Sequence, residues 1–599
     1  ETEKISTGIN IDEDTKRVYP YNNLASNLIG FCGTDNTGIQ GIEDSWNSVL
    51  QGTPGKLTTS TDAIQEEIPD SNQTYIPAEN GSDIVLTIDY YIQTVLEKYL
   101  KQAVVENNAE SGTVVAMAPS TGDILGMACY PDYNLNTPFE PNTEELKATW
   151  DTLDSKTQSD TLYNMWKNNV VSSPYEPGSP YKLITAATAL EENITSEDVP
   201  NDFYYNGSIE VADRNISCWT QAHKGAKTLR QALQVSCNPS LIQLGQRIGA
   251  ETLYKYYQAF GFFDKTGIDL PQEASSTYWD LEDVKDVELA TMSFGQRFTI
   301  TPIQLVSAVS AIANDGILMK PRIVKQIINP ETGTTTDIEP VQVRQVISKS
   351  TSERMRNLMK SVVDDGSGRL AKVEGYSIGG KTGTSEPQAG REDEGYIASY
   401  VAIAPTEKPE ICLLIAVHNP NPNNEGSHQG GQVCGPVVSQ MLSEILPYLG
   451  LTSSNAQTST DTVEEDTSYA TVPDIRNKTV TEAEKLLKQA GFTTKVNISG
   501  DKNSTLVTDQ TPKPGSSIPK NSIIVLYTEE NDTRVSVKVP DFKDKTLAQA
   551  ENMAKANNLN ITSEGSGTVI SQSIMVDTAV EEGTIIKLTL STENDGTNQ

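Results

Sequence analysis

Several residue types are scarce in this sequence of 599 residues: only six are cysteine and three are histidine. Six cysteines are too few for a scaffold built on disulfides, so the domains must be held together by ordinary hydrophobic cores. Long apolar runs are missing as well. The longest, such as residues 411–417, fall far short of the roughly 18 residues that a membrane-spanning helix requires. We therefore expect no segment of this sequence to cross a bilayer.

Basic residues are in the minority. The sequence has 46 Lys and Arg residues against 80 Asp and Glu residues, which gives a formal net charge of -34 at pH 7. A surface of this sign repels phosphate over most of its area, which argues against a nucleic-acid partner. Any negatively charged ligand must therefore be bound in a local cationic pocket.

The length predicts several domains, because a chain of this size is too long for one hydrophobic core. Residues 1–78 have a mixed pattern punctuated by glycines, which predicts a small α+β domain. In residues 79–451, strand-like segments flank a region of helical pattern at 144–313. This arrangement predicts a sheet that is assembled from distant segments, with helices packed on its faces.

The C-terminal part of the chain repeats itself. Residues 452–469 are poor in hydrophobic residues and rich in Ser, Thr, Asp and Glu, which is typical of a linker. Residues 470–529 and 535–592 then share one pattern at a period of 67 residues, in which "TVPDIRNKTVTEAEKLLKQAGF" parallels "KVPDFKDKTLAQAENMAKANNL". We predict two small tandem α/β modules here.

A serine and a lysine three residues apart stand at the head of the apolar segment "PYEPGSPYKLITAATAL". Ser179 followed by Pro180 is typical of a helix start. The helix that follows is apolar nearly all round and is therefore expected to be buried, which carries Lys182 into a low-dielectric environment.

Burial disfavours the ammonium form of a lysine, so Lys182 can act as a general base for Ser179, whose hydroxyl is a weak nucleophile on its own. The alternative is a capping serine followed by a lysine whose ammonium reaches solvent. This spacing is common by chance, so the pair alone does not decide between the two interpretations.

Two further motifs favour catalysis. "SCN" supplies Ser236, which can relay a proton to a departing amine, and Asn238, which can hydrogen-bond a substrate amide. "KTGT" supplies Lys381, whose positive charge suits a substrate carboxylate. The backbone N–H groups of Ser179 and Thr384 would form an oxyanion hole. The predicted catalytic residues are Ser179, Lys182, Ser236, Asn238, Lys381 and Thr384, with Thr382 and Gly383 as substrate-binding residues.

With these three motifs in this order, the sequence resembles class B penicillin-binding proteins, which are peptidoglycan D,D-transpeptidases. "RVYPYNNLASNLIG" and "GIQGIEDSWNSVLQGTPG" resemble the N-terminal pedestal of that family, and "SFGQRFTITPIQLVSAVSAIANDG" resembles part of its transpeptidase domain. The two repeats, which open with "VPD" at Val472 and Val539, are similar to PASTA domains. The combination resembles division and sporulation enzymes of Gram-positive bacteria.

The resemblance implies an α+β multidomain fold. Residues 1–78 would form a truncated pedestal or dimerisation region, and residues 79–451 a transpeptidase domain with a helical lobe and a five-stranded antiparallel sheet. The active site would lie between lobe and sheet. Ser179 would form an acyl-enzyme with a peptidoglycan stem peptide, an amine of a neighbouring strand would resolve it, and β-lactams would acylate the same serine. None of these steps needs a cofactor.

The resemblance also implies partners and a location. Family members carry a membrane anchor before the pedestal, whereas the first ten residues here lack the basic and apolar regions of a signal peptide. We therefore expect an anchor before residue 1 and a location outside the cytoplasmic membrane. The expected partners are lipid II-derived strands, β-lactams and a glycosyltransferase of the division or spore-envelope machinery. Pro180 and Tyr181 depart from the residues usual inside the first motif, from which we expect an altered pocket shape.

Four potential metal ligands lie within 25 residues: Asp213, Cys218, His223 and Cys237. Two thiolates, an imidazole and a carboxylate suit tetrahedral zinc, and Cys237 lies between Ser236 and Asn238, so a structural zinc ion there would brace the catalytic loop. A disulfide between the two cysteines and two free buried thiols are the alternatives.

Other functions fit the three motifs: a β-lactamase, a β-lactam sensor that acylates only to signal, or a scaffold within a division or spore-envelope complex. A β-lactamase needs a second base and has no use for a pedestal or for PASTA-like repeats. A sensor is expected to carry a signalling membrane domain. No such membrane domain is seen in the sequence, and the intact Ser179, Lys182 and Lys381 argue against a pure scaffold, which favours the transpeptidase.

Overall fold

The computed structural model describes residues 15–58, 74–387, 395–423, 426–451, 469–496, 501–520, 522–529, 534–565 and 567–591. The predicted linker at 452–469 falls outside these ranges except for its last residue. The chain forms two compact units, residues 1–443 and 444–599. Among the described helices, none combines the length and the apolar character that a membrane span needs.

A five-stranded antiparallel sheet forms the centre of the first unit. Its strand order is β14-β15-β16-β4-β5. The strands are β4 (Ser111–Met117), β5 (Ile124–Tyr130), β14 (Gly379–Ser385), β15 (Ile397–Ala404) and β16 (Ile411–His418). The first two and the last three strands lie on either side of a long insertion in the sequence, as expected for a sheet assembled from distant segments.

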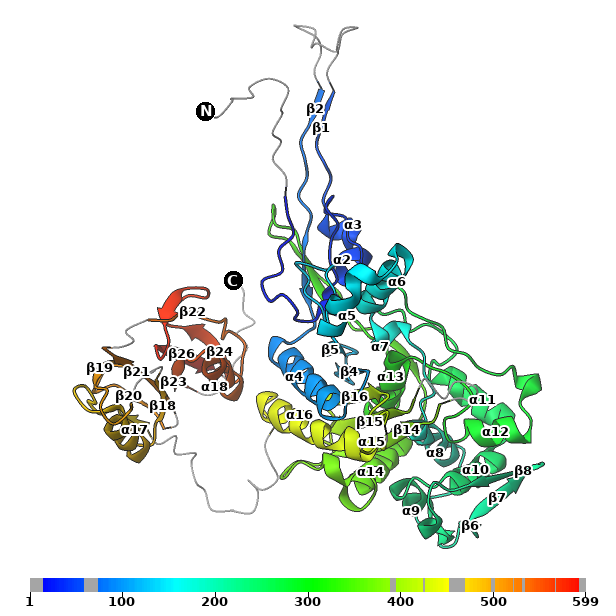
Figure 1. The fold of residues 1–599 in the computed structure, drawn as a ribbon. Helices are drawn as coiled ribbons and strands as arrows, with labels where there is room; N and C mark the ends of the chain where they lie inside the picture. The colour runs from blue at the N-terminus through cyan, green and yellow to red at the C-terminus, as the bar shows by residue number, and fades with distance from the viewer. Residues whose placement is uncertain are drawn as a thin grey trace, which may run out of the picture. The chain divides into compact units, whose positions relative to one another are not determined.

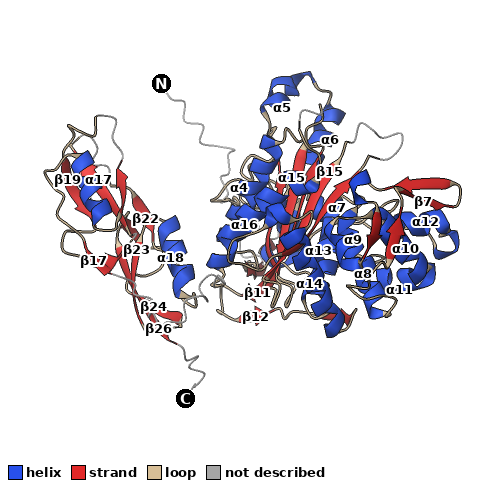
Figure 2. Cartoon of the chain, turned by 90° about the horizontal axis from the view of Figure 1, so that it is seen from below, coloured by secondary structure: helices blue, strands red, loops and turns tan. Residues whose placement is uncertain are grey.

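Helices cover both faces of this sheet (Figure 2). Helix α4 (Tyr90–Glu106) packs on β4 and β5, where a Cβ at Gly112 would lie 2.8 Å from a methyl group of Val104. Helix α13 (Pro302–Ala313), all of whose residues are buried, packs on the opposite face. The alternation of side chains along β4 explains this, because Gly112 and Met117 point to opposite faces.

The insertion forms the helical lobe. Its main helices are α5 (Glu144–Thr149), α6 (Ser155–Trp166), α7 (Asn169–Ser172), α8 (Lys182–Glu191), α9 (Leu229–Gln234), α10 (Asn238–Ile248), α11 (Ala250–Ala259) and α12 (Asp286–Met292). The helical pattern predicted for 144–313 missed two small antiparallel pairs. These are β6 (Phe203–Tyr205) with β9 (Gly225–Lys227), and β7 (Ser208–Val211) with β8 (Arg214–Ser217).

Shorter elements complete the first unit. Near its N-terminus lie α1 (Ser26–Ile29), α2 (Gly41–Ser45) and α3 (Asn47–Leu50), and the pair β1 (Lys56–Thr58) and β2 (Thr74–Ile76) projects as an arm (Figure 1). The strand-like segment that begins at residue 83 is β3 (Asp83–Leu86), which pairs with β11 (Val324–Ile328), and β11 pairs in turn with β12 (Thr335–Asp337). The others are β10 (Ile317–Met319), β13 (Gln342–Gln345), α14 (Lys349–Asp365), α15 (Gly430–Val433) and α16 (Gly435–Tyr448).

The second unit contains the two repeats, and each has its own apolar core. The first repeat consists of β17 (Tyr469–Thr471), α17 (Val480–Gln489), β18 (Thr493–Val496), β19 (Val507–Thr511), β20 (Ser517–Pro519) and β21 (Ile523–Thr528). The second consists of β22 (Ser536–Lys538), α18 (Leu547–Ala556), β23 (Asn560–Glu564), β24 (Thr568–Gln572), β25 (Ala579–Glu581) and β26 (Ile585–Ser591). Thr479 and Thr546 cap the two helices in the same way, so the repeat seen in the sequence is a repeat of structure.

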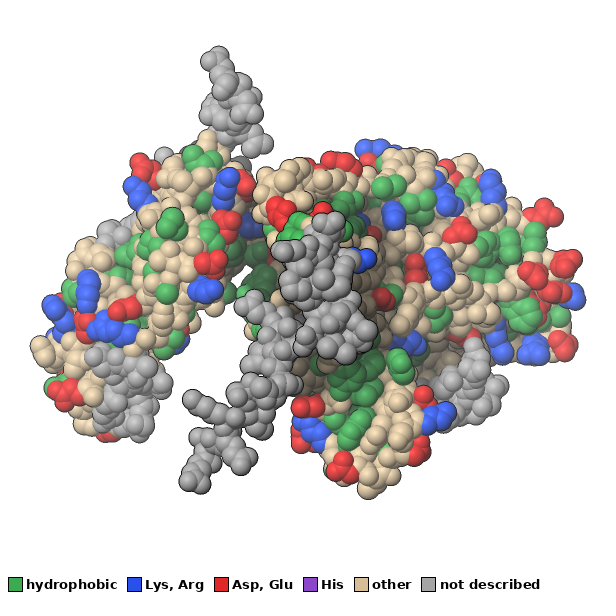
Figure 3. Space-filling view, turned by 90° about the horizontal axis from the view of Figure 1, so that it is seen from above, with side chains coloured by type: hydrophobic (Ala, Val, Ile, Leu, Met, Phe, Trp, Pro, Cys, Tyr) green, Lys and Arg blue, Asp and Glu red, His purple; other side chains and the backbone are tan. Residues whose placement is uncertain are grey.

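Acidic and basic side chains are interspersed over the face of the first unit that Figure 3 shows. The net charge of -34 is therefore not gathered into one patch on that face.

Candidate active site

A cleft of about 490 Å³ lies along strand β14 and brings the three sequence motifs together. Its lining includes residues from each of them: Gly178 and Ser179, Ser236 and Asn238, and Thr382, Gly383 and Thr384. The two lysines of the motifs are fully buried behind this lining. The predicted catalytic and substrate-binding residues thus converge from the helical lobe and the sheet.

Ser179 begins a short 3-10 turn, Ser179–Tyr181, that runs directly into α8. Gly178 rather than Ser179 holds the capping position, at φ 57° and ψ -143°, a conformation that favours glycine. Its N–H donates to the carbonyl of Gly295 at 2.9 Å. The serine hydroxyl caps no backbone group of the helix and is available for other interactions.

Pro180 and Tyr181 are not among the residues that line the cleft, and the altered pocket shape expected from them stays a prediction. A Cβ at Gly383 would lie 2.7 Å from the ring of Pro180, which shows that the proline packs against the backbone of β14. Tyr181 is fully buried in the lobe, with its ring 4.6 Å from that of Phe298 and its hydroxyl 3.1 Å from that of Tyr278. Both residues therefore hold in place the turn that carries Ser179.

Lys182 is fully buried and hydrogen-bonds the second motif. Its Nζ donates to the carbonyl of Ser236 at 2.8 Å, to the hydroxyl of Ser236 at 3.1 Å and to Oδ1 of Asn238 at 2.6 Å. Among the described contacts, no hydrogen bond joins Lys182 directly to Ser179. The hydroxyl of Ser236 instead contacts both groups and connects them.

The Ser236 hydroxyl is the centre of the polar network. It donates to Oγ of Ser179 at 2.9 Å and also accepts from Nζ of Lys381 at 3.0 Å. Ser236 has φ 54°, a left-handed conformation that is strained for a serine and is fixed by its surroundings. The nucleophile candidate is thus connected to two lysines through one hydroxyl.

Burial changes the protonation of both lysines. It lowers the pKa of Lys182 from 10.5 to about 8. Burial, and then repulsion from Lys182, lowers the pKa of Lys381 well below its ordinary value. An appreciable fraction of Lys182 is therefore a neutral amine at neutral pH, which is the form that can accept a proton.

Strand β14 forms one wall of the cleft, and Gly383 in this strand has no space for a side chain. A Cβ at Gly383 would lie 2.2 Å from Oγ of Ser399. The hydroxyl of Thr384 accepts from the N–H of Gly430 at 3.1 Å, which fixes the start of α15 against the strand. Lys381 also donates to the carbonyl and the hydroxyl of Thr382, at 3.0 and 3.3 Å.

The predicted zinc site is not supported. Among the described residues, no group of three or more His, Cys, Asp or Glu side chains is arranged to hold a metal ion. Asp213 is exposed in the turn between β7 and β8, and Sγ of Cys218 is 3.8 Å from Nδ1 of His223. Cys218 and Cys237 are free thiols that hydrogen-bond each other, which lowers the pKa of Cys218 and raises that of Cys237.

Two aromatic features of the cleft were missed in the sequence. Trp219 lines it with 54% of its surface exposed, and its indole N–H donates to the carbonyl of Val235 at 3.3 Å. The rings of Tyr396 and His428 stack at 4.0 Å and form another part of the lining. Nothing in their local sequence marks them, because the lining of a cleft depends on tertiary contacts.

The loop at 366–369 was also missed. Ser367 and Arg369 line the cleft, and Oγ of Ser367 lies 3.4 Å from Oγ1 of Thr382. Its sequence, "GSGR", has the glycines of a tight loop but no feature that points to a catalytic domain.

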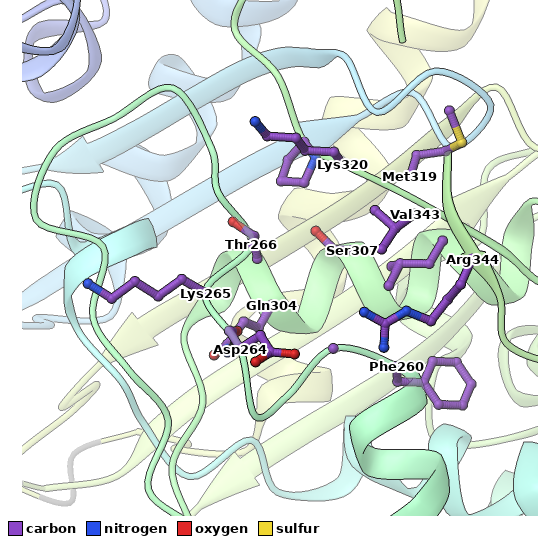
Figure 4. Close-up of a pocket in the computed structure, with 13 residues that line it drawn as sticks. Phe260, Asp264, Lys265, Thr266, Gln304, Ser307, Met319, Lys320, Val343 and Arg344 are labelled. Carbon is purple, nitrogen blue, oxygen red and sulfur yellow. Dashed lines mark hydrogen bonds between the residues drawn. The ribbon is translucent and has the colours of Figure 1, made fainter. Parts of the chain in front are cut away.

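A smaller cavity of about 50 Å³ lies between α13 and the strands β10 and β13 (Figure 4). Gln304 and Ser307 reach it from α13, and Arg344 reaches it from β13. The amide of Gln304 donates to the carbonyls of Phe262 and Asp264, at 3.3 and 2.9 Å, so its role is to hold that loop. No residue of the three motifs lines this cavity.

Comparison with known families agrees with the geometry of the cleft. Residues 112–443, more than half of the chain, match the Penicillin binding protein transpeptidase domain. The chain belongs to the penicillin-binding transpeptidase family. Residues 1–86 match the Penicillin-binding Protein dimerisation domain, and residues 470–530 and 537–592 match the PASTA domain. The family resemblance and the fold expected from the sequence are confirmed.

Individual relatives have moderate sequence identity to this chain. Stage V sporulation protein D of Bacillus subtilis is 36% identical over 531 residues, which cover 88% of this chain and 78% of that protein. Peptidoglycan D,D-transpeptidase FtsI of Escherichia coli K12 is 30% identical, over 74% of this chain and 69% of its own length. The crystal structure of Penicillin binding protein 3 from Mycobacterium tuberculosis in complex with aztreonam has a TM-score of 0.61 at 26% identity, covering 73% of this chain and 91% of that one.

Proposed function

We propose that the protein is a serine D,D-transpeptidase that cross-links peptidoglycan stem peptides through an acyl-enzyme on Ser179 and that β-lactams acylate and inhibit. The observation that carries this proposal is the hydrogen bond of 2.9 Å from Ser236 to Ser179, with Lys182 and Lys381 both donating to Ser236. Membership in the penicillin-binding transpeptidase family supports it.

Acylation begins when Oγ of Ser179 attacks the carbonyl carbon of the penultimate D-Ala of a donor stem peptide. The serine proton passes to the neutral amine of Lys182 through the hydroxyl of Ser236, which contacts both groups. The backbone N–H groups of Ser179 and Thr384 stabilise the developing oxyanion. The C–N bond then breaks, and the terminal D-Ala leaves as an amine that takes a proton back through Ser236.

The second step reverses this proton path. The amine of an acceptor strand attacks the ester carbonyl, loses its proton to the network around Ser236, and forms the new amide bond while Oγ of Ser179 regains a proton. Asn238 is placed to hydrogen-bond the donor peptide, since it lines the cleft and its Oδ1 is fixed by Lys182. Thr382 and Gly383 present the edge of β14 to the donor.

A β-lactamase is the less favoured alternative. It requires a second base that activates water for deacylation, and the one carboxylate among the described residues of the cleft lining, that of Glu386, is exposed. The pedestal and the PASTA repeats have no part in such a reaction.

The proposed setting is outside the cytoplasmic membrane. The donor would come from lipid II-derived strands, a membrane anchor would precede residue 1, and a glycosyltransferase of the division or spore-envelope machinery would supply new glycan. The names of two relatives, a stage V sporulation protein and a peptidoglycan D,D-transpeptidase, support the part of this proposal that concerns sporulation and peptidoglycan.

The test is labelling with a fluorescent penicillin. The wild-type protein is expected to form a covalent adduct that persists for hours, and Ser179→Ala is expected to form none. An unlabelled wild type would refute acylation, and rapid release of hydrolysed penicillin would identify a β-lactamase. Release of D-Ala from a stem pentapeptide, with product formed on an added acceptor amine, then distinguishes transpeptidation from hydrolysis.

A further inference from the structure

The loop at 366–369 is fixed between the two halves of the cleft. The N–H of Ser367 donates to the carbonyl of Gln234, at the end of α9 and two residues before Ser236, at 2.8 Å. The hydroxyl of Tyr400, which stands opposite Thr382 in the sheet, donates to the carbonyl of Gly368 at 3.0 Å. The loop is therefore preorganised on the helical lobe and on the sheet at once.

This loop adds polar groups to the Thr382 end of the cleft. Ser367 Oγ and Thr382 Oγ1 lie 3.4 Å apart, and Arg369, two residues further, lines the same cleft. Arg369 is exposed, and no carboxylate among the described residues forms an ion pair with it. In a chain with 80 acidic residues, a guanidinium that lines this cleft and has no ion pair among the described residues can bind an anionic ligand.

The second lysine of the site is poorly suited to supply that charge. Lys381 is fully buried and uses its Nζ on the hydroxyl of Ser236 and on both oxygens of Thr382. Its burial and its proximity to Lys182 lower its pKa and so disfavour the ammonium form. A guanidinium, in contrast, keeps its charge at any pH in the physiological range.

We propose that Arg369, together with the hydroxyls of Ser367 and Thr382, binds the C-terminal carboxylate of the donor peptide and the corresponding carboxylate of a penicillin. This inference rests on the proposed function, because it assumes a donor whose last residue carries a free carboxylate. A guanidinium binds such a group through two parallel N–H···O bonds, whereas hydroxyls supply one each. Arg369 would thus make the enzyme select the last peptide bond of a chain over internal bonds.

The experiment compares a penicillin as the free acid with its methyl ester, which lacks the negative charge. Second-order rate constants for acylation of Ser179 are measured for the wild type, Arg369→Ala and Arg369→Lys. Arg369→Ala is expected to slow acylation by the free acid about 10- to 100-fold, the loss typical of one charge-assisted interaction, and to leave the ester unchanged. Arg369→Lys should recover part of the rate. The loss caused by Arg369→Ala should appear in the dissociation constant of the penicillin more than in the rate constant of the chemical step.

Lys372→Ala is the matched control, because Lys372 is an exposed cation three residues further that does not line the cleft. Equal losses for acid and ester in Arg369→Ala would show a structural role and overturn the proposal, as would no loss at all. A wild type that neither compound acylates would instead refute the proposed function. Thermal unfolding of each variant separates misfolding from loss of binding.

Discussion

The catalytic cleft and the C-terminal repeats place their charged groups in opposite ways. In the cleft, two lysines are fully buried, and they donate to hydroxyl, carbonyl and amide oxygens with no carboxylate among their described partners. In the repeats, the cores are apolar and the described ion pairs are exposed or half-buried. The most buried carboxylate among these pairs is that of Glu582, which meets the Nζ of Lys495 at 2.7 Å. A buried charge without a counter-ion lowers the stability of the fold but leaves the group reactive. A carboxylate that is paired with a cation instead holds parts of the structure together.

The largest effect is expected from Lys182→Met. Loss of the base should slow acylation by fluorescent penicillin about 10²- to 10⁴-fold. The free energy of unfolding should stay the same or rise at pH 7, because the ammonium is buried at a cost. A variant that loses activity and stability together would contradict the contrast between the two regions.

A large steric effect is expected from Gly383→Ala. The added methyl group would meet Oγ of Ser399 and the ring of Pro180, so β14 must shift away from Ser179. Acylation should fall about 100-fold, in line with the cost of moving a reacting group by about 1 Å. Gly515→Ala is the control, since a Cβ at Gly515 meets nothing within 4 Å and the backbone strain expected from its φ of 86° is confined to a repeat. Equal rates for the two variants would refute the close packing of the cleft.

The fold could be predicted from the sequence to the extent that it depends on local pattern. Strand-like segments on both sides of a helical region indicated a sheet assembled from distant segments, and the repeat indicated two equal modules. The pairs β6–β9 and β7–β8 were missed because they are short and lie on the lobe surface, where hydrophobic periodicity is weak. Pro180 and Tyr181 were expected to alter the shape of the pocket; the packing of the Tyr181 ring with Phe298 in the lobe could not be predicted from the sequence.

The site was predictable where residues form motifs and not where they meet through folding. Ser179, Ser236 and Lys381 were proposed from their motifs, and in the structure hydrogen bonds connect all three. The position of Ser236 between Ser179 and Lys182 could not be predicted, since it depends on the packing of α9 on α14. The four potential zinc ligands were close in sequence, but the hairpin turn keeps Asp213 exposed.

A moderate effect is expected from pH. Because burial lowers the pKa of Lys182 to about 8, the neutral amine is the minor form below that pH. The acylation rate should rise about tenfold per pH unit below pH 7 and level off above pH 8. The same shift predicts that the free energy of unfolding increases between about pH 8 and 10.5, where the unfolded state still binds the proton that the folded state has lost. A flat rate profile from pH 6 to 9 would exclude Lys182 as the base.

A smaller effect, confined to the repeats, is expected from Lys495→Met. Glu582 would keep its hydrogen bond from Asn558 at 2.9 Å but lose its cation, which should lower the free energy of unfolding of the second unit by about 1–3 kcal/mol. The exposed pair of Lys587 with Glu564 is the control, and Lys587→Met should cost at most about 1 kcal/mol. Acylation should be unchanged in both, and a loss in either would show that the repeats influence the cleft.

The smallest effect is expected from removing the repeats. Every described residue of the cleft lies in residues 1–443, so a chain that ends at residue 451 should react with fluorescent penicillin at the rate of the full chain, within about twofold. A tenfold loss of that rate would show that the repeats contribute to the reaction in the cleft.

The packing of Pro180 on Gly383 has a consequence for antibiotic resistance. A bacterium under β-lactam selection cannot block drug entry by enlarging residue 383, because the space is already taken by Pro180 and Ser399. The exposed side chain of Trp219, which also lines the cleft, is under no such steric limit.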